Sequence, residues 1–417
     1  MIGTNWSGNI AYRAAELQSP RSVAEVVDLV RAAPAVKALG SRHCFNDIAD
    51  TAGVAVLVAE LPREIRVDEE RRVVRAPAGL RYGDISPELD AAGWALPNLA
   101  SLPHISLAGA IATGTHGSGD AVPSLAASVA GVEIVTADGD VRMQRRGDAD
   151  FAGTVVSLGA LGVVTAVEID IVPRYEIAQT VFDGLPLASA LEHYDEITAV
   201  GYSVSMFTTW RDPDVIDQVW VKRRADEPGA LPGDLFGARP AAGKRHQLPG
   251  VDPLFCTEQG GARGPWYARL PHFKLEFTPS NGDELQSEYL LPRAHAVAAI
   301  ERVRALAPDL APLVQVCELR TVAADDLWLS PAAGAATTGI HFTWVPDQPA
   351  VEAFLPRLEA ALEPFGARPH WGKLFDVAAA RERVPDLYPR WRDFAALRER
   401  WDPRGVFRND FLARLGL

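Results

Sequence analysis

Four polar side chains stand two residues apart on two segments that otherwise have the composition of buried strands. Glu318 and Arg320 lie on the first segment, and His341 and Thr343 on the second. Residues i and i+2 of a strand point to the same face, so adjacent strands would present all four side chains together. Such a group could bind hydroxyl groups and stabilise negative charge that develops on an oxygen atom. A solvated face carrying a surface ion pair is the ordinary alternative, and the apolar neighbours of these residues argue against it.

Glycine-rich turns indicate a second kind of chemistry. Residues 38–46 read Ala-Leu-Gly-Ser-Arg-His-Cys-Phe-Asn, in which a strand ends in a turn that carries His43. Consecutive N–H groups in such a turn can cradle a diphosphate. Residues 98–119 and 157–165 are also rich in small side chains, which let a flat or charged ligand approach the backbone closely. Each stretch alone could reflect tight packing, but together they favour one extended ligand.

Three of these segments resemble a known family of flavin-binding domains. The turn with His43, the Ala-Thr-Gly-Thr-His-Gly segment at 112–117 and the Gly-Ala-Leu-Gly-Val-Val segment at 159–164 look like the FAD-binding domain of the vanillyl-alcohol-oxidase superfamily. The resemblance implies that FAD is attached covalently through His43. It implies an FAD site formed by Ala38, Leu39, Gly40, Ser41, Arg42, His43, Cys44, Ser101, Ser106, Gly109, Thr113, Gly114, Thr115, His116, Gly162, Val163, Val164 and His370.

Three further motifs narrow the resemblance to the bacterial alditol oxidases of the xylitol or sorbitol oxidase type, which are relatives of the aldonolactone oxidases. They are Asn-Trp-Ser-Gly-Asn at 5–9, Cys-Glu-Leu-Arg-Thr-Val at 317–322 and His-Trp-Gly-Lys at 370–373. The implied reaction oxidises a terminal hydroxyl of a small polyol, with hydride transfer to flavin N5 and reoxidation by dioxygen to give hydrogen peroxide. The implied substrate-binding residues are Ser101, Glu318, Arg320, His341, Thr343 and Lys373, of which Arg320, Lys373 and Glu318 are the catalytic candidates. Lys373 and a water molecule are the two candidates for the proton acceptor.

The chain departs from the alditol oxidase pattern at the two residues that flank His43. Alditol oxidases tend to read Gly-Ser-Gly-His-Ser-Phe-Asn there, whereas this chain has Arg42 and Cys44 in place of the second Gly and the Ser. If this position needs a positive φ, Arg42 carries some strain. The guanidinium could equally add a cation near the diphosphate. His43 itself is retained, so covalent attachment remains the expectation.

The order of predicted elements indicates an α+β protein of two domains. A helix is expected at 20–33, hairpins at 65–76 and 132–143, and a long loop at 224–250. The later strands at 314–322 and 339–345 and a helix at 292–307 predict a second domain of antiparallel sheet plus helices. The resemblance implies the two-domain FAD-binding fold of the vanillyl-alcohol-oxidase type. Its expected parts are an FAD-binding domain at 1–173, a substrate domain at 174–367 and a segment at 368–417 that returns to the first domain.

Composition excludes several other classes of protein. A net charge of -13 without a long Lys/Arg run argues against nucleic-acid and membrane partners. Three widely spaced cysteines form neither a disulfide framework nor a metal site, and no metal is expected. A signal-peptide pattern is missing from the first residues, which predicts a cytoplasmic protein, and we expect a monomer. His193, His246, His272 and His295 fall in loop-like surroundings and are expected at the surface.

Two alternatives to polyol oxidation stay open on the sequence. The Glu-x-Arg strand would serve an aldonolactone oxidase or dehydrogenase equally well. The second alternative is a flavin-binding protein without catalysis, such as a cofactor carrier or sensor, and the convergence of Glu318, Arg320 and Lys373 argues against it. The motif at residues 5–9 and the His341/Thr343 strand favour polyols.

Overall fold

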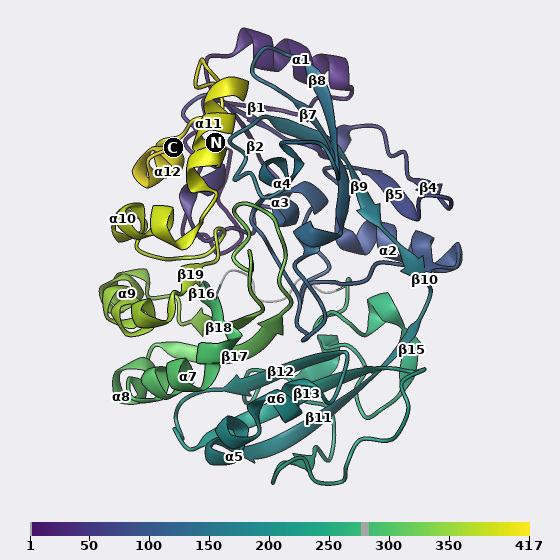
Figure 1. Ribbon diagram of the computed structural model, residues 1–417, viewed down its shortest axis with the longest axis vertical. Helices are drawn as coiled ribbons and strands as arrows, with labels where there is room; N and C mark the ends of the chain where they lie inside the picture. The colour runs from purple at the N-terminus through teal and green to yellow at the C-terminus, as the bar shows by residue number, and fades with distance from the viewer. Residues whose placement is uncertain (1, 277–282) are drawn as a thin grey trace.

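The fold has an upper part, which contains the smaller sheets and both chain termini, and a lower part, which is built on one broad sheet (Figure 1). The computed structural model describes residues 2–276 and 283–417. Its sheets and helices confirm the predicted α+β class. Within the described residues, none of the helices has both the length and the apolar composition needed to cross a bilayer.

The first part of the chain forms a small parallel sheet covered by a helix. Strands β1 (Glu16–Gln18), β3 (Val54–Val56) and β2 (Val36–Ala38) pair in that order. Helix α1 (Val23–Ala32) begins where the Ser22 side chain accepts a hydrogen bond from the Glu25 N–H at 3.2 Å. Val26 and Val30 are buried on one face of α1, as the apolar spacing predicts.

A five-stranded antiparallel sheet lies beside this unit, with the strand order β4-β5-β9-β7-β8. Its strands are β4 (Arg66–Asp68), β5 (Val73–Pro77), β7 (Val129–Val135), β8 (Val141–Arg145) and β9 (Val163–Asp170). The two predicted hairpins are confirmed. Gly139 adopts φ +78° in the turn between β7 and β8, which glycine allows without strain. Helices α2 (Tyr82–Ala91), α3 (Leu107–Ala112) and α4 (Phe151–Thr154) and the short pair β6 (Trp94–Ala95) and β10 (Val172–Pro173) complete this part.

The second part is built on a nine-stranded sheet with the order β14-β11-β13-β12-β17-β18-β16-β19, and β15 pairs with β11. Its strands are β11 (Glu176–Pro186), β12 (Ser203–Thr208), β13 (Val215–Arg224), β14 (Arg239–Pro240), β15 (Arg263–Pro265), β16 (Leu285–Pro292), β17 (Val314–Val322), β18 (Thr337–Trp344) and β19 (Arg368–Pro369). Helices α5 (Leu187–Glu192), α6 (Tyr194–Thr198), α7 (Ala296–Arg304), α8 (Ala307–Leu310) and α9 (Gln348–Leu362) accompany it. The antiparallel pairing of β17 with β18 confirms that the two polar strands are neighbours.

The end of the chain lies against its beginning. Helices α10 (Val377–Leu387), α11 (Trp391–Trp401) and α12 (Asp410–Leu415) follow the large sheet. The Val36 N–H donates to the Val406 carbonyl at 2.8 Å, and the Asn409 side chain donates to the carbonyls of Ile48 and Asp50. These contacts favour a C-terminal segment that returns to the first domain. The division at residues 173 and 367 itself stays a prediction.

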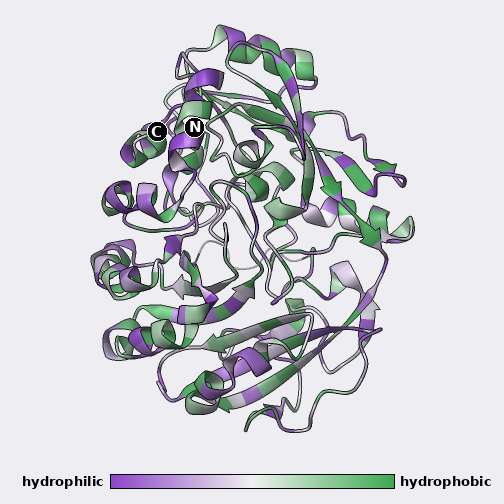
Figure 2. Ribbon diagram, viewed as in Figure 1, coloured by the Kyte–Doolittle hydropathy of each residue, from purple (hydrophilic) through white to green (hydrophobic). Residues whose placement is uncertain are grey.

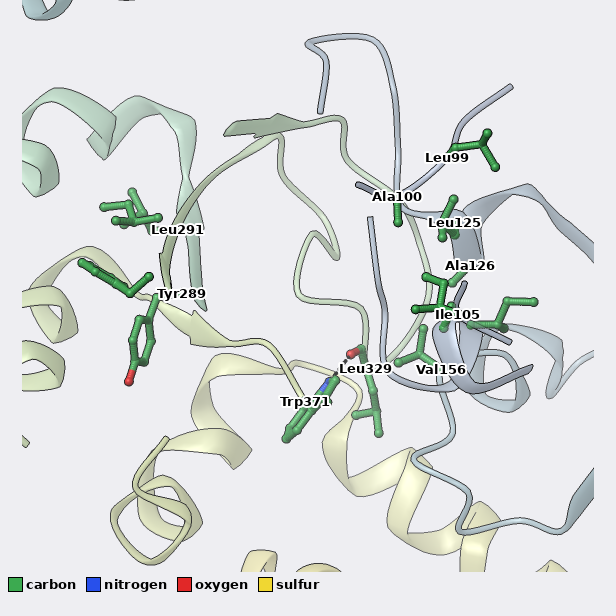
Figure 3. Packing of buried hydrophobic residues seen from close by; sticks show 14 of the residues in the cluster. Leu99, Ala100, Ile105, Leu125, Ala126, Val156, Tyr289, Leu291, Leu329 and Trp371 are labelled. Atoms are coloured by element: carbon green, nitrogen blue, oxygen red, sulfur yellow. Dashed lines mark hydrogen bonds between the residues drawn. The ribbon is translucent and has the colours of Figure 1, made fainter. Parts of the chain in front are cut away.

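Apolar packing joins the two parts of the molecule. Figure 3 shows Leu99, Ala100 and Val156 from the first part within the same hydrophobic cluster as Tyr289 and Leu291 of β16. In the same cluster the Trp371 indole N–H donates to the Leu329 carbonyl at 2.8 Å. Hydrophilic and hydrophobic residues alternate around the outer helices (Figure 2), as expected for helices that bury one face. A shared core of this kind fixes how the two parts pack against each other.

Candidate functional site

A cavity of about 630 Å³ lies between the glycine-rich turns of the first part and the polar face of the large sheet. Its wall contains all of the sequence-predicted site residues except two. Gly114 has φ +68° and packs against Pro331, and Val163 is fully buried where β9 pairs with Val135 of β7. The structure therefore places these two behind the cavity wall, where they support it without lining it.

One end of the cavity is built from small residues and backbone. A Cβ atom added to Gly40 would lie 2.4 Å from the Ser106 Oγ, and one added to Gly109 would lie 2.7 Å from the same atom. The Ser41 N–H donates to Ser106 Oγ at 3.3 Å, and the Ser106 N–H donates to Ser41 Oγ at 3.2 Å. Side chains larger than hydrogen would fill this end, so the geometry suits the close approach of an extended ligand with a diphosphate.

His43 lies in the cavity wall, and its Nε2 is buried without a hydrogen-bond partner among the described residues. Burial lowers the pKa of His43 to about 3, with smaller contributions from Lys373 and His104, so its imidazole is neutral. The Trp6 ring lies 4.7 Å from the His43 ring. A buried, neutral, unpartnered nitrogen of this kind fits an attachment point for a cofactor.

The turn around His43 is fixed by the N-terminal segment. The Asn5 side chain donates to the Cys44 carbonyl at 2.8 Å, and the Trp6 N–H donates to the Arg42 carbonyl at 2.8 Å. Arg42 adopts φ +60°, a conformation that costs a non-glycine residue roughly 1 kcal/mol. Its guanidinium donates to the Ile2 carbonyl at 2.9 Å and lies over the Tyr12 ring. The substitution is thus accommodated by contacts that only a long cationic side chain can make.

The polar end of the cavity is one face of the large sheet. Glu318 of β17 stands directly opposite His341 of β18, and His341 stands opposite Glu288 of β16. Thr343 and Arg320 lie on the same face, two residues away along their strands. The side chain of Lys373 enters from the turn that follows β19. Strand periodicity predicts that four of these six side chains share a sheet face, and the register brings those four together.

Ion pairs organise this polar end around Glu288, a residue that the sequence analysis missed. Arg320 Nη2 lies 2.5 Å from Glu288 Oε1, and Lys373 Nζ lies 2.7 Å from Glu288 Oε2. Burial alone would raise the pKa of Glu288, but the charges of Arg320 and Lys373 outweigh it and hold that pKa well below its usual range. Burial lowers the pKa of Lys373, an effect that the negative charge of Glu288 opposes. Glu288 therefore acts as a fixed counter-ion for both cations.

Buried polar atoms at this end have no hydrogen-bond partner among the described residues, and they include Arg320 Nε and His341 Nε2. Buried polar groups are almost always satisfied in a complete site, so these atoms are available to a bound ligand. The expectation that His272 lies at the surface is wrong, because it is 5% exposed and its Nε2 lies 3.1 Å from Glu318 Oε1.

Comparisons with known proteins agree with this geometry. The family model described as an FAD binding domain matches residues 15–143, and that of D-arabinono-1,4-lactone oxidase matches residues 281–415. The alditol oxidase of Streptomyces sp. (strain IKD472) is 50% identical over 415 residues, which cover 99% of this chain and 98% of that protein. The L-gulono-1,4-lactone dehydrogenase of Mycobacterium tuberculosis is 31% identical over 99% of both chains. Cholesterol oxidase from B. sterolicum has the same fold, with a TM-score of 0.78 at 17% identity over 99% of this chain and 96% of that one.

Proposed function

The chain belongs to the alditol oxidase family, within the vanillyl-alcohol-oxidase superfamily of FAD-dependent oxidases, and we propose that it oxidises a terminal hydroxyl of a small polyol to the aldose. Xylitol and sorbitol are the substrates we favour, with dioxygen as the electron acceptor. The observation that supports this proposal most strongly is that one cavity is lined both by the small-residue turns around His43 and by the polar face of Glu318, Arg320 and Lys373. A cytoplasmic monomer with FAD attached through His43 is part of the same proposal.

The cofactor would occupy the small-residue end. The residues that line it there include Ala38 to Cys44, Ser106, Gly109, Thr113 and Val164, with His116 and His370 where this end meets the polar face. FAD, when bound, supplies the acceptor for the hydride that leaves the carbinol carbon. The remaining work falls to the protein, which must bind and orient the polyol and handle the charge and the proton of its hydroxyl group.

The polar end has the donors and acceptors that a chain of alcohols requires. Arg320 and Lys373 bring positive charge to the oxygen from which a proton departs. Glu318 accepts hydrogen bonds from substrate hydroxyls, while the hydroxyls of Ser101 and Thr343 can both donate and accept. Because Glu288 pairs with both cations, the charges stand in place before substrate arrives. Lys373 and a water molecule remain the two candidates for the proton acceptor.

A substrate panel with peroxide detection tests this proposal. The enzyme should produce hydrogen peroxide with xylitol and sorbitol and should be inactive, or nearly so, with L-gulono-1,4-lactone. The contrast is informative because the Mycobacterium tuberculosis relative is named for the lactone. Peroxide from the lactone alone would favour the aldonolactone alternative, and bound flavin without turnover of any substrate would favour the non-catalytic one.

Thr343→Ala should weaken substrate binding and spare the chemical step. Thr343 lines the cavity at the position where β18 pairs with Val316 of β17 and with Gln286 of β16, away from the ion pairs of Glu288. Loss of one neutral hydrogen bond should raise the KM for xylitol by roughly 3- to 10-fold, and more for the longer sorbitol. Steady-state kinetics on both polyols measure this, with Thr343→Ser as the control that keeps the hydroxyl. A fall in kcat at unchanged KM would refute a binding role.

A further inference from the structure

Two buried side chains form a series of hydrogen bonds that ends at Glu318, and the proposed chemistry does not use them. Lys222 lies on β13, and His272 lies in the segment that follows β15. His272 Nε2 lies 3.1 Å from Glu318 Oε1, and His272 Nδ1 lies 3.0 Å from Lys222 Nζ. Exposure of the three residues is 1% for Lys222, 5% for His272 and 4% for Glu318. Three ionisable groups thus meet in a line within the protein interior.

The hydrogen-bond partners of Lys222 and His272 determine which ring nitrogen of His272 carries the proton. Lys222 Nζ also donates to the Leu270 carbonyl. In its ammonium form Lys222 has donors and no acceptor, so His272 Nδ1 then accepts its hydrogen bond and the ring proton resides on Nε2. That N–H then points at the carboxylate of Glu318. The opposite tautomer would set a lone pair of the ring against the carboxylate and leave both unsatisfied.

The negative charge of Glu318 stabilises the positive charge of Lys222. Burial lowers the pKa of Lys222 to about 7, and the negative charge of Glu318 acts against this shift. Burial, with a smaller contribution from the positive charge of Lys222, lowers the pKa of His272 to about 4, so the ring between them is neutral. The pKa of Glu318 is held well below its usual range, because Arg320 and His272 outweigh the effect of burial.

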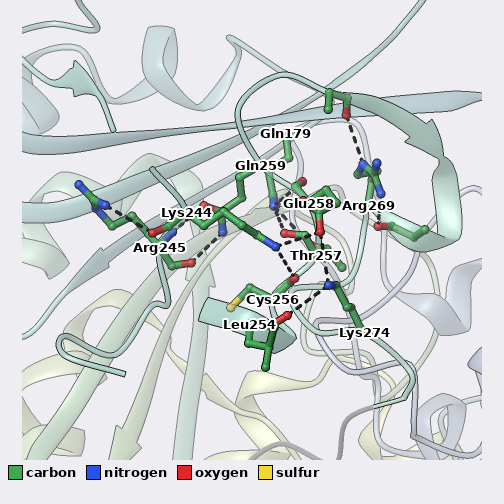
Figure 4. A network of polar contacts seen from close by, with 12 residues as sticks. Gln179, Lys244, Arg245, Leu254, Cys256, Thr257, Glu258, Gln259, Arg269 and Lys274 are labelled. Carbon is green, nitrogen blue, oxygen red and sulfur yellow. Dashed lines mark hydrogen bonds and ion pairs between the residues drawn. The ribbon is translucent and has the colours of Figure 1, made fainter. Parts of the chain in front are cut away.

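The surrounding segment leaves His272 little freedom. Its N–H donates to the Ser101 carbonyl and its carbonyl accepts from the Thr257 N–H, both at 2.9 Å. Figure 4 shows part of the polar network around Thr257, in which the Gln179 side chain donates to Thr257. The Thr257 Oγ1 also donates to the Pro271 carbonyl at 2.8 Å. Rings of Phe207 and Trp220 pack edge-on against the imidazole. His272 therefore connects two groups of the proposed substrate site, Ser101 through its backbone and Glu318 through its ring.

We propose that Lys222 and His272 are a positioning pair for Glu318. Lys222 sets the tautomer of His272, and the His272 Nε2–H holds Oε1 of Glu318. The other oxygen, Oε2, lies 3.7 Å from Arg320 Nε and 3.7 Å from His341 Nδ1, and both of these residues line the cavity. Held in this way, Oε2 is the oxygen that accepts a hydrogen bond from the polyol. This inference rests on the proposed function, which assigns that acceptor role to Glu318.

A double-mutant cycle on the holoenzyme tests the pair. Lys222→Met keeps most of the side-chain volume and removes the donor, so it should raise the KM for xylitol about 10-fold with little change in the limiting rate of flavin reduction. His272→Gln presents an amide N–H to Glu318 without needing a fixed ring tautomer, so it should retain most of the affinity. In the His272→Gln background, Lys222→Met should change KM less than about 2-fold. Lys244→Met, which removes a lysine of the neighbouring network, is the matched control and should leave KM unchanged.

An equal rise of KM in both backgrounds would overturn the proposal, because a purely structural lysine acts independently of the residue at 272. If Lys222→Met does not fold, the ¹⁵N shifts of the wild-type histidine rings decide, with the His272 signals assigned by their loss in His272→Gln. A protonated Nε2 and a bare Nδ1 are expected, and a proton on Nδ1 would refute the assignment. The tautomer measurement requires no substrate. Failure of the wild type to oxidise polyols would therefore refute the proposed function and remain distinguishable from failure of the positioning pair.

Discussion

Arg320→Ala should lower the limiting rate of flavin reduction by xylitol roughly 10²- to 10³-fold, the usual cost of losing one preorganised donor to developing charge. Negative charge grows on the substrate oxygen as the hydride departs, so a fixed guanidinium favours the transition state over the ground state. The guanidinium is fixed by its 2.5 Å contact with Glu288 and by its position on β17, and its Nε is free of other hydrogen bonds among the described residues. Anaerobic stopped-flow reduction across a xylitol and sorbitol series measures this rate.

Arg320→Lys should recover only part of the lost rate, because a flexible ammonium cannot reproduce the planar fork of the guanidinium. If Arg320 only gripped ground-state hydroxyls, Arg320→Ala would raise KM and spare the limiting rate. A limiting rate within a few-fold of wild type would therefore exclude the proposed role. Lys373, the other cation paired with Glu288, would then become the leading electrostatic group.

His43→Ala should abolish covalent attachment of FAD. The imidazole is buried and neutral, and its Nε2 has no hydrogen-bond partner within the described part of the chain, so the nitrogen is free to form a bond. Acid-precipitated wild-type protein should stay yellow, whereas the precipitate of His43→Ala should be colourless with all remaining flavin in the supernatant. The acid precipitate of Cys44→Ser, a control that changes only the adjacent residue, should stay yellow. Release of all flavin from the wild type on precipitation would contradict covalent attachment.

Much of the site could be predicted because strand periodicity determines which side chains share a face. The strand predicted at 314–322 has the observed bounds of β17, and the pairing of Glu318 with His341 follows once β17 and β18 are neighbours. The glycine-rich turns were equally informative, since small residues near a ligand leave a direct trace in the sequence. Most of the cavity lining at that end was predicted from them.

The remaining residues depend on contacts between distant segments. Glu288 lies 85 residues from Lys373 along the chain, and nothing local indicates that the two meet. A lone carboxylate in the apolar strand β16 was the available signal, whereas Lys222 on β13 is followed by Arg223 and Arg224 and did not stand out as a lone charge. His272 follows a proline in an irregular segment, which is typical of a surface position, and only the fold buries it beside Glu318. Gly114 and Val163 lie behind the cavity wall, and the sequence does not separate them from lining residues, because residues that shape a wall carry the same small or apolar signature as those that line it.

Anaerobic mixing of the purified protein with xylitol tests the central claim most directly, because it observes the chemical step without dioxygen or a coupled assay. Flavin absorbance should bleach rapidly and to completion with xylitol, at a rate that saturates with concentration, and should persist with L-gulono-1,4-lactone. This result would identify the polar face of Glu318, Arg320 and Lys373 as a polyol oxidation site. Rapid bleaching by the lactone and none by xylitol would contradict the account.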